Sequence, residues 1–157
     1  SKVLMPRPIY SPNSRTRSLR KKEADYQDLC EILEELRSLP HGTSILVEGR
    51  RDKAALRNLG VRVPIVQAST RPLFGLLPSH RKVIVLTDYD REGRDIARAI
   101  EATARSLGIA PDLEYRRRIQ RATMGEISHI EGLDTYLVNL EAKALRKPQI
   151  SRKDPGM

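Results

Sequence analysis

Three carboxylates follow an apolar segment near the middle of the chain. Residues 83–87 are apolar or β-branched at every position, which is typical of a strand buried on both faces of a parallel sheet. Asp88, Asp90 and Glu92 come next, and Gly93 then opens a helical pattern. Because Asp88 and Asp90 are two residues apart, they point the same way in an extended segment and could hold one hard cation.

A second predicted strand also ends in a carboxylate. Residues 44–47 form a short apolar run before Glu48, and a helical pattern follows as far as Gly60. A carboxylate at the end of a buried strand is costly unless it faces a cleft, a cation or an arginine, so we favour a functional role for Glu48. Asp52 lies in the first turn of the helix, where it suits the helix dipole, and we assign it a structural role.

The two acidic segments are expected to meet, because the carboxyl ends of neighbouring parallel strands lie at one edge of a sheet. Up to four carboxylates gathered there could not all stay ionised without a cation. Oxygen ligands with no cysteine and no nearby histidine favour Mg²⁺ or Mn²⁺ over Zn²⁺, and Mg²⁺ keeps positions for water and phosphate oxygens. The pattern therefore predicts phosphoryl-transfer chemistry, with four candidate metal ligands: Glu48, Asp88, Asp90 and Glu92.

Basic side chains flank both acidic segments. Arg50, Arg51 and Lys53 follow the first strand, and Arg91 and Arg94 follow the second. These cations could clamp a phosphodiester and stabilise its developing charge. They could equally neutralise the acids in the folded protein, and both roles stay open at this point.

Strands alternate with helices along most of the chain. This alternation is typical of an α/β fold, and it predicts a compact, Rossmann-like sheet of about four parallel strands flanked by helices. The remaining pattern predicts helices over residues 23–39, 70–77, 93–107, 121–127 and 133–145, further strands near 61–68 and 111–115, and a short extended piece at 128–131.

Four segments are predicted: a flexible basic arm (1–22), an N-terminal helix that packs on the core (23–41), an α/β domain (42–145) and a disordered tail (146–157). The net charge is +9, and seven of these charges lie in residues 1–22, which contain no acid. Such an arm could bind a phosphate backbone or serve solubility alone. The three arginines at 116–118 could line a nucleic-acid path or begin a solvated helix.

Composition excludes several classes of protein. The single Cys30 allows no internal disulfide and no cysteine-rich metal cluster. No run approaches the roughly 18 apolar residues of a membrane span, and no signal peptide opens the sequence. We therefore expect a cytoplasmic protein with no membrane partner.

Two motifs, in this order, resemble those of a known family. The first is Val-Glu-Gly-Arg-Arg-Asp at residues 47–52, and the second is Thr-Asp-Tyr-Asp-Arg-Glu-Gly-Arg-Asp-Ile-Ala at residues 87–97. Together they resemble the Toprim domain shared by type IA topoisomerases, DnaG-type primases, recombination-repair proteins and ribosomal-RNA maturation nucleases. The resemblance covers roughly residues 42–140. The length and the segment His-Ile-Glu-Gly-Leu-Asp at 129–134 are similar to small stand-alone Toprim proteins of archaea.

The resemblance implies a Toprim fold and a role for each acid. Glu48 matches the family glutamate proposed as general acid or base in strand cleavage and joining. Asp88 and Asp90 match the metal-coordinating aspartates, and Glu92 matches a further acid found in topoisomerases. Tyr89 departs from the pattern, since proline is common there; because the topoisomerase nucleophile comes from a separate domain, we interpret Tyr89 as a loop residue.

The resemblance and the length of the chain together narrow the possible functions to three. We set topoisomerase activity aside, because a chain of 157 residues leaves no room for the gate and the tyrosine-bearing domain, and Arg94 stands where topoisomerases usually carry glutamate. Priming is set aside because the sequence contains no zinc-binding module to grip a template. The first hypothesis is a Mg²⁺-dependent nuclease or phosphotransfer enzyme acting on RNA or DNA. The alternative is a non-catalytic nucleic-acid or ribonucleoprotein binding module that uses the same cleft and arm. A nucleotide-binding regulator ranks last, because the turn after Glu48 lacks a Gly-rich phosphate loop.

Overall fold

Strand β1 (Thr43–Val47) lies inside the sheet and pairs in parallel with a strand on each side. The structure, a computed structural model, describes residues 14–68 and 82–144. Its sheet has four parallel strands in the order β2-β1-β3-β4, which confirms the predicted Rossmann-like α/β fold. The other strands are β2 (Ile65–Gln67), β3 (Lys82–Val85) and β4 (Pro111–Asp112).

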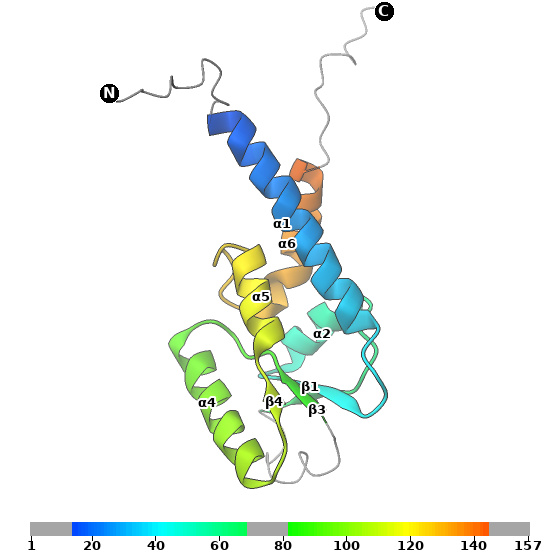
Figure 1. Ribbon diagram of the computed structural model, residues 1–157, viewed down its shortest axis with the longest axis vertical. Helices are drawn as coiled ribbons and strands as arrows, with labels where there is room; N and C mark the ends of the chain where they lie inside the picture. Colours follow the sequence, from blue (N-terminus) through cyan, green and yellow to red (C-terminus); the bar gives the residue numbers. More distant parts are fainter. Residues whose placement is uncertain (1–13, 69–81, 145–157) are drawn as a thin grey trace, which may run out of the picture.

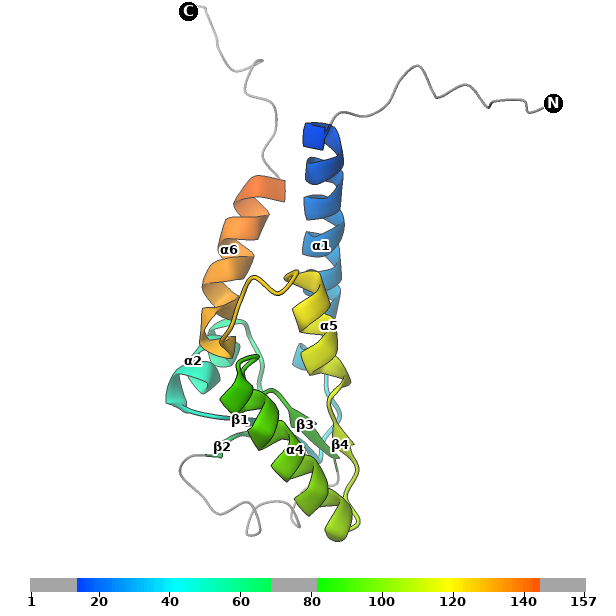
Figure 2. The same ribbon diagram turned by 90° about the vertical axis from the view of Figure 1, so that its left-hand side faces the viewer.

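Helices cover both faces of the sheet. Helix α4 lies on one face, and α1, α2, α5 and α6 supply the core on the other (Figure 1). Helices α1 and α6 run side by side away from the sheet, as a second view confirms (Figure 2). No helix in the described residues combines the length and apolarity needed to cross a bilayer. The bounds are α1 (Ser14–Arg37), α2 (Arg50–Asn58), α4 (Arg91–Ser106), α5 (Glu114–Ala122), the 3-10 helix η2 (Ile130–Gly132) and α6 (Leu133–Ala144).

Alternate residues of β1 and β3 supply two separate hydrophobic clusters. Ile45 and Ile84 belong to the cluster with α1, α2, α5 and α6, whereas Leu46, Val83 and Val85 belong to the cluster with α4. All five side chains are at most 2% exposed, and each such burial contributes roughly 1.5–3 kcal/mol. The central strands are therefore buried on both faces, as their unbroken apolar sequence predicts.

Helix α1 begins at Ser14, so residues 14–22 of the predicted flexible arm are helical. The segment contains no proline or glycine and consists mainly of Ser, Arg, Leu and Lys, of which the last three are good helix formers. The prediction was wrong here because it gave the positive charge more weight than helix propensity. The predictions for residues 1–13, 70–77 and 146–157 lie outside the described residues.

The region after α4 also differs from the prediction. Strand β4 ends at Asp112 and α5 begins at Glu114, so the strand predicted over 111–115 is too long and the helix predicted over 121–127 begins too late. The Asp112 side chain accepts a hydrogen bond from the Glu114 N–H at 2.8 Å. An aspartate that binds the backbone two residues on favours a turn, which explains the early end of the strand.

Glu35 of α1 is held by two residues of α5. The Arg118 guanidinium donates to both Glu35 oxygens, at 2.8 and 2.7 Å, and the Tyr115 hydroxyl donates to one of them at 3.2 Å. The Arg118 hydrogen bonds are the main reason that the pKa of Glu35 lies below its usual value of 4.5. Arg118 therefore joins α5 to α1.

Replacing Glu35 with Gln should destabilise the protein at neutral pH but not in acid. A carboxyl whose pKa is lowered by folding contributes stability above its unfolded pKa, and this contribution is lost as the pH falls through the folded pKa. Because the pair is partly exposed, we expect the free energy of unfolding of E35Q to drop by about 1 kcal/mol near neutral pH. Urea unfolding near pH 7 and near pH 3, the latter below the ordinary pKa of a Glu side chain, measures how much the difference shrinks as the carboxyl becomes protonated.

Glu34→Gln is the matched control, because Glu34 is the preceding residue and its 3.3 Å contact with Arg37 is exposed. We expect almost no change for this variant. Equal destabilisation of E35Q at both pH values would contradict the prediction and assign the effect to packing.

Candidate functional site

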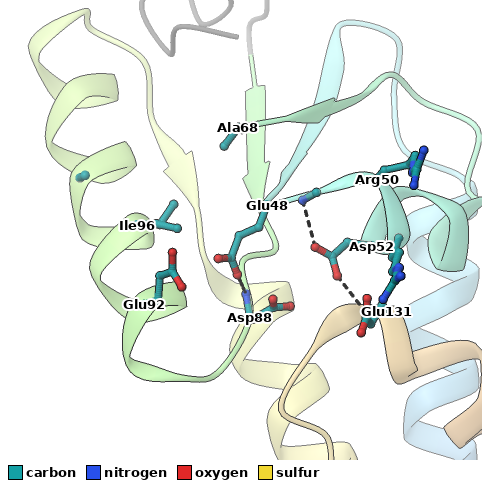
Figure 3. Close-up of a pocket in the computed structure, with 11 residues that line it drawn as sticks. Glu48, Arg50, Asp52, Ala68, Asp88, Glu92, Ile96 and Glu131 are labelled. Carbon is teal, nitrogen blue, oxygen red and sulfur yellow. Dashed lines mark hydrogen bonds between the residues drawn. The ribbon is translucent and has the colours of Figure 1, made fainter. Parts of the chain in front are cut away.

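The carboxyl ends of β1 and β3 meet at one edge of the sheet. Leu46 is paired with Val85, so the residues that follow the two strands lie next to each other. There the Asp88 N–H donates to Glu48 Oε2 at 2.7 Å, across 40 positions of sequence (Figure 3). The structure thus brings the two acidic segments together, as their positions at the strand ends predict.

A cavity of about 700 Å³ opens at this edge. In Figure 3 the carboxylates of Glu48 and Glu92 face the same space from β1 and α4. The described lining combines carboxylates, two arginines, and small or aliphatic residues. These are Glu48, Asp52, Asp88, Glu92 and Glu131; Arg50 and Arg51; and Gly49, Ala68, Ile96 and Ala99.

Asp88 lies deepest among the predicted ligands. Its side chain is 7% exposed, and its Oδ1 accepts a hydrogen bond from the Ile130 N–H at 2.8 Å. Burial is the main cause that raises the pKa of Asp88 to about 7, and the neighbouring carboxyls of Glu48 and Asp52 raise it further, against the effect of the Ile130 amide. The site therefore holds more negative charge than it can easily keep ionised.

Asp90 and His129 lie close to Asp88 and form with it a cluster of possible metal ligands. Asp90 caps α4, with Oδ1 accepting from the Gly93 N–H at 2.7 Å, and its Oδ2 lies 3.4 Å from His129 Nε2. One ligand atom from each of Asp88, Asp90 and His129 lies within 4.8 Å of the others. The expectation that no histidine lies near the acids is therefore wrong. His129 is far away in sequence, and its inclusion in the 129–134 segment was the only signal for it.

Asp52 has a wider role than the sequence predicts. It is buried, and it accepts hydrogen bonds from the Gly49 N–H at 3.1 Å and the Glu131 N–H at 3.0 Å. Burial raises its pKa, as do the charges of Glu48 and Glu131, while the two amides lower it. Asp52 therefore both caps α2 and contributes a carboxylate to the cavity, and sequence reasoning recognised the first role alone.

The five predicted phosphate-binding residues divide into four groups. Arg50 and Arg51 line the cavity, and Arg91 borders an adjoining hollow with Glu92. Lys53 is half-buried on α2 and is not among the described lining residues. Arg94 is likewise not among the described lining residues; it donates to the Tyr89 carbonyl at 2.8 Å. It therefore supports the loop that carries Asp88 and Asp90, which we call the acidic loop.

Arg116 supports the same loop, a role that the sequence did not reveal. Its guanidinium donates to the carbonyls of Thr87, at 3.0 Å, and Asp88, and lies 4.8 Å from the centroid of the Tyr89 ring. The Tyr89 hydroxyl in turn donates to the Arg116 carbonyl at 2.7 Å. Burial raises the pKa of Tyr89, and this buried, hydrogen-bonded side chain fits the interpretation of Tyr89 as a loop residue.

Comparisons with known proteins show the family of the chain. It is 34% identical over 129 residues to the UPF0292 protein of Thermococcus gammatolerans, covering 80% of this chain and 94% of the relative. The chain belongs to the UPF0292 family. The UPF0292 protein of Pyrococcus horikoshii is 37% identical over 112 residues, with 69% of this chain and 83% of that protein covered. No family model matches the sequence.

A solved structure also resembles this UPF0292 protein. It is described as a putative protein from Aquifex aeolicus, with a TM-score of 0.59 and 28% sequence identity. The match covers 66% of this chain and 95% of that one. The likeness agrees with the α/β fold.

Because Gly93 has no side chain, the first turn of α4 can lie directly against the backbone of Asp88 in this UPF0292 protein. A Cβ atom at this position would lie 2.0 Å from the Asp88 carbonyl oxygen, so any other residue would collide with the backbone. The Thr87 hydroxyl donates to the Gly93 carbonyl at 2.7 Å, and the Gly93 N–H donates to Asp90. Gly93 is therefore the point at which the loop carrying Asp88 and Asp90 is fixed.

Replacing Gly93 with Ala should destabilise the protein, although alanine normally favours a helix. The collision with the Asp88 carbonyl forces the loop to move, and overpacking typically costs about 1–3 kcal/mol. Because the contact is with backbone, we expect a loss of about 3 kcal/mol in the free energy of unfolding, at the upper end of this range. Urea unfolding followed by circular dichroism measures it.

Gly49→Ala is the control, because no heavy atom lies within 4 Å of the added Cβ and the backbone is extended, with φ at −148°. We expect it to cost less than about 1 kcal/mol. If G93A were as stable as G49A, the close contact between Gly93 and Asp88 would be disproved.

Proposed function

We propose that the protein is a Mg²⁺- or Mn²⁺-dependent enzyme that cleaves or transfers phosphodiesters in RNA or DNA, using a Toprim-type acidic centre. A cytoplasmic location without a membrane partner is part of this proposal. The observation that carries it is the hydrogen bond from the Asp88 N–H to Glu48 at 2.7 Å, because it joins the two motifs at one cavity. The resemblance of both motifs to the Toprim family gives independent support.

The carboxylates fit a divalent cation. Asp88 and Glu92 line the cavity with Glu48, and Asp90 lies beside Asp88. Carboxylate oxygens are the ligands that Mg²⁺ and Mn²⁺ prefer. Burial, and after it the neighbouring carboxyls of Glu48 and Asp52, raise the pKa of Asp88 to about 7, and a bound cation would favour its ionised form. When bound, the ion would polarise a phosphate oxygen and lower the pKa of a water.

Glu48 is the residue proposed to move a proton. Its Oε2 is fixed by the Asp88 amide, which orients the carboxyl toward the cavity and leaves Oε1 to accept or donate a proton at the substrate. The half-buried position of Glu48 keeps the group accessible. General acid–base catalysis of this kind typically contributes about 10²–10⁴-fold to the rate.

Arg50 and Arg51 are proposed to bind the phosphate backbone. Both line the cavity and lie in the first turn of α2, where the helix dipole also favours an anion. Arg91 at the adjoining hollow would extend this contact along α4. The cavity thus offers cations for the phosphate next to carboxylates for the metal.

A nuclease assay tests the proposal. Purified protein should cut structured RNA or single-stranded DNA in Mg²⁺ or Mn²⁺, and Glu48→Gln or Asp88→Asn should lower the rate by at least about 10²-fold. Glu34→Gln is the control, since Glu34 is an exposed residue of α1 that contacts Arg37 at 3.3 Å and is not among the described residues of the cavity lining. Cleavage that persists in EDTA, or in both site variants, would overturn the proposal.

The alternative is a binding module without turnover. It is favoured by the charge distribution, because seven of the nine net positive charges lie in residues 1–22, outside the acidic segments. Such a protein would bind nucleic acid in EDTA and after Asp88→Asn, with no cleavage products and a steep dependence on salt.

Deletion of residues 1–13 tests where a nucleic acid would bind. The deletion removes Lys2 and Arg7 and leaves α1 intact, since this helix begins at Ser14. If the arm contacts phosphates, the slope of log affinity against log salt should fall by up to about 2. Filter binding at several salt concentrations measures the slope, and an unchanged slope would move the contact to the folded part.

A further inference from the structure

A short segment between α5 and α6 crosses the acidic centre. Its backbone makes three contacts there: the Ser128 carbonyl accepts from the Tyr89 N–H at 2.8 Å, the Ile130 N–H donates to Asp88 at 2.8 Å, and the Glu131 N–H donates to Asp52 at 3.0 Å. The segment is thus attached both to the Asp88 loop and to the start of α2. This brings residues that are distant in sequence into the centre.

His129 lies in the middle of this segment. The segment was predicted to be extended over 128–131; His129 is extended, with φ −129° and ψ 140°, but the 3-10 helix η2 begins at the next residue. His129 is exposed and the next residue, Ile130, is fully buried, so the two side chains face different ways. The backbone thus directs Ile130 into the core and the His129 imidazole toward Asp90.

The distances around His129 suit a bound ion better than a direct hydrogen bond. His129 Nε2 and Asp90 Oδ2 are 3.4 Å apart, which is longer than the roughly 2.7–2.9 Å of a charge-assisted bond. Neighbouring ligands of an octahedral ion at about 2.2 Å lie about 3.1 Å apart, and opposite ligands about 4.4 Å apart. The ligand atoms of Asp88, Asp90 and His129 lie within 4.8 Å of one another, so a small closure would seat one ion.

We infer that His129 is a metal ligand of the acidic centre, and that its imidazole makes the centre prefer Mn²⁺, or a similar transition-metal ion, to Mg²⁺. Imidazole nitrogen suits first-row transition metals, whereas Mg²⁺ takes oxygen ligands almost without exception. This inference rests on the proposed function, which places a cation among the same acids. It adds a ligand and a metal preference that the two motifs do not specify.

Pulsed electron paramagnetic resonance of the full chain with Mn²⁺ alone tests the inference. A directly bound imidazole couples its nitrogen nuclei to the Mn²⁺ electrons, so the wild-type protein should show nitrogen modulation. His129→Gln should abolish this signal. The same substitution should weaken Mn²⁺ binding by at least about tenfold, the loss that even outer partners of metal ligands cause, and should weaken Mg²⁺ binding, measured by competition, much less.

His41→Gln is the matched control, because His41 is exposed in the turn before β1; the nitrogen signal and the Mn²⁺ affinity should be unchanged. Mn²⁺ binding without nitrogen modulation, or modulation that survives His129→Gln, would overturn the inference and leave the proposed metal-dependent function standing. A wild-type protein that binds no Mn²⁺ would overturn both.

Discussion

Hydrogen bonds from backbone N–H groups hold the acidic centre together. Four carboxylates accept them, and the donors come from the second acidic segment, from the turn before α2 and from the segment between α5 and α6. A one-residue slip of β1 against β3 would separate these partners and turn the strands' side chains to the wrong faces, so the site depends on the strand register. The pairs are Glu48 with Asp88, Asp52 with Gly49 and Glu131, Asp88 with Ile130, and Asp90 with Gly93.

These contacts explain which parts of the site could be predicted. The meeting of Glu48 with Asp88 follows from two apolar strands that each end in an acid, because parallel pairing fixes where strand ends lie. His129 and Arg116 could not be found in this way. Their positions depend on the path of the chain after β4, where a single Asp112 side chain ends the strand early and moves the start of α5. Local patterns describe strands well, but they do not determine where a connection between helices will cross the sheet edge.

Asp88 lies between two different environments. On one side the cavity contains Glu48 and Glu92 with two arginines and an aliphatic wall, which together suit a phosphate group and its attached apolar parts. On the other side Asp90 and the His129 imidazole lie close together. Because Asp88 is buried and fixed by Ile130, an ion bound to it would touch both environments. In the proposed function, the choice of metal would therefore be related to the position of the substrate.

The sequence left open whether the nearby arginines neutralise the acids, and the hydrogen bonds argue against this. Arg94 and Arg116 donate to carbonyls of the acidic loop. Within residues 14–68 and 82–144, no ion pair joins an arginine or lysine to Glu48, Asp88 or the other carboxylates of the cavity. Burial is the main cause of the raised pKa of Asp88, and the neighbouring carboxyls of Glu48 and Asp52 add to it. Because Arg94 and Arg116 bind backbone carbonyls, the carboxylates of the cavity keep oxygens that the proposed metal ion could use.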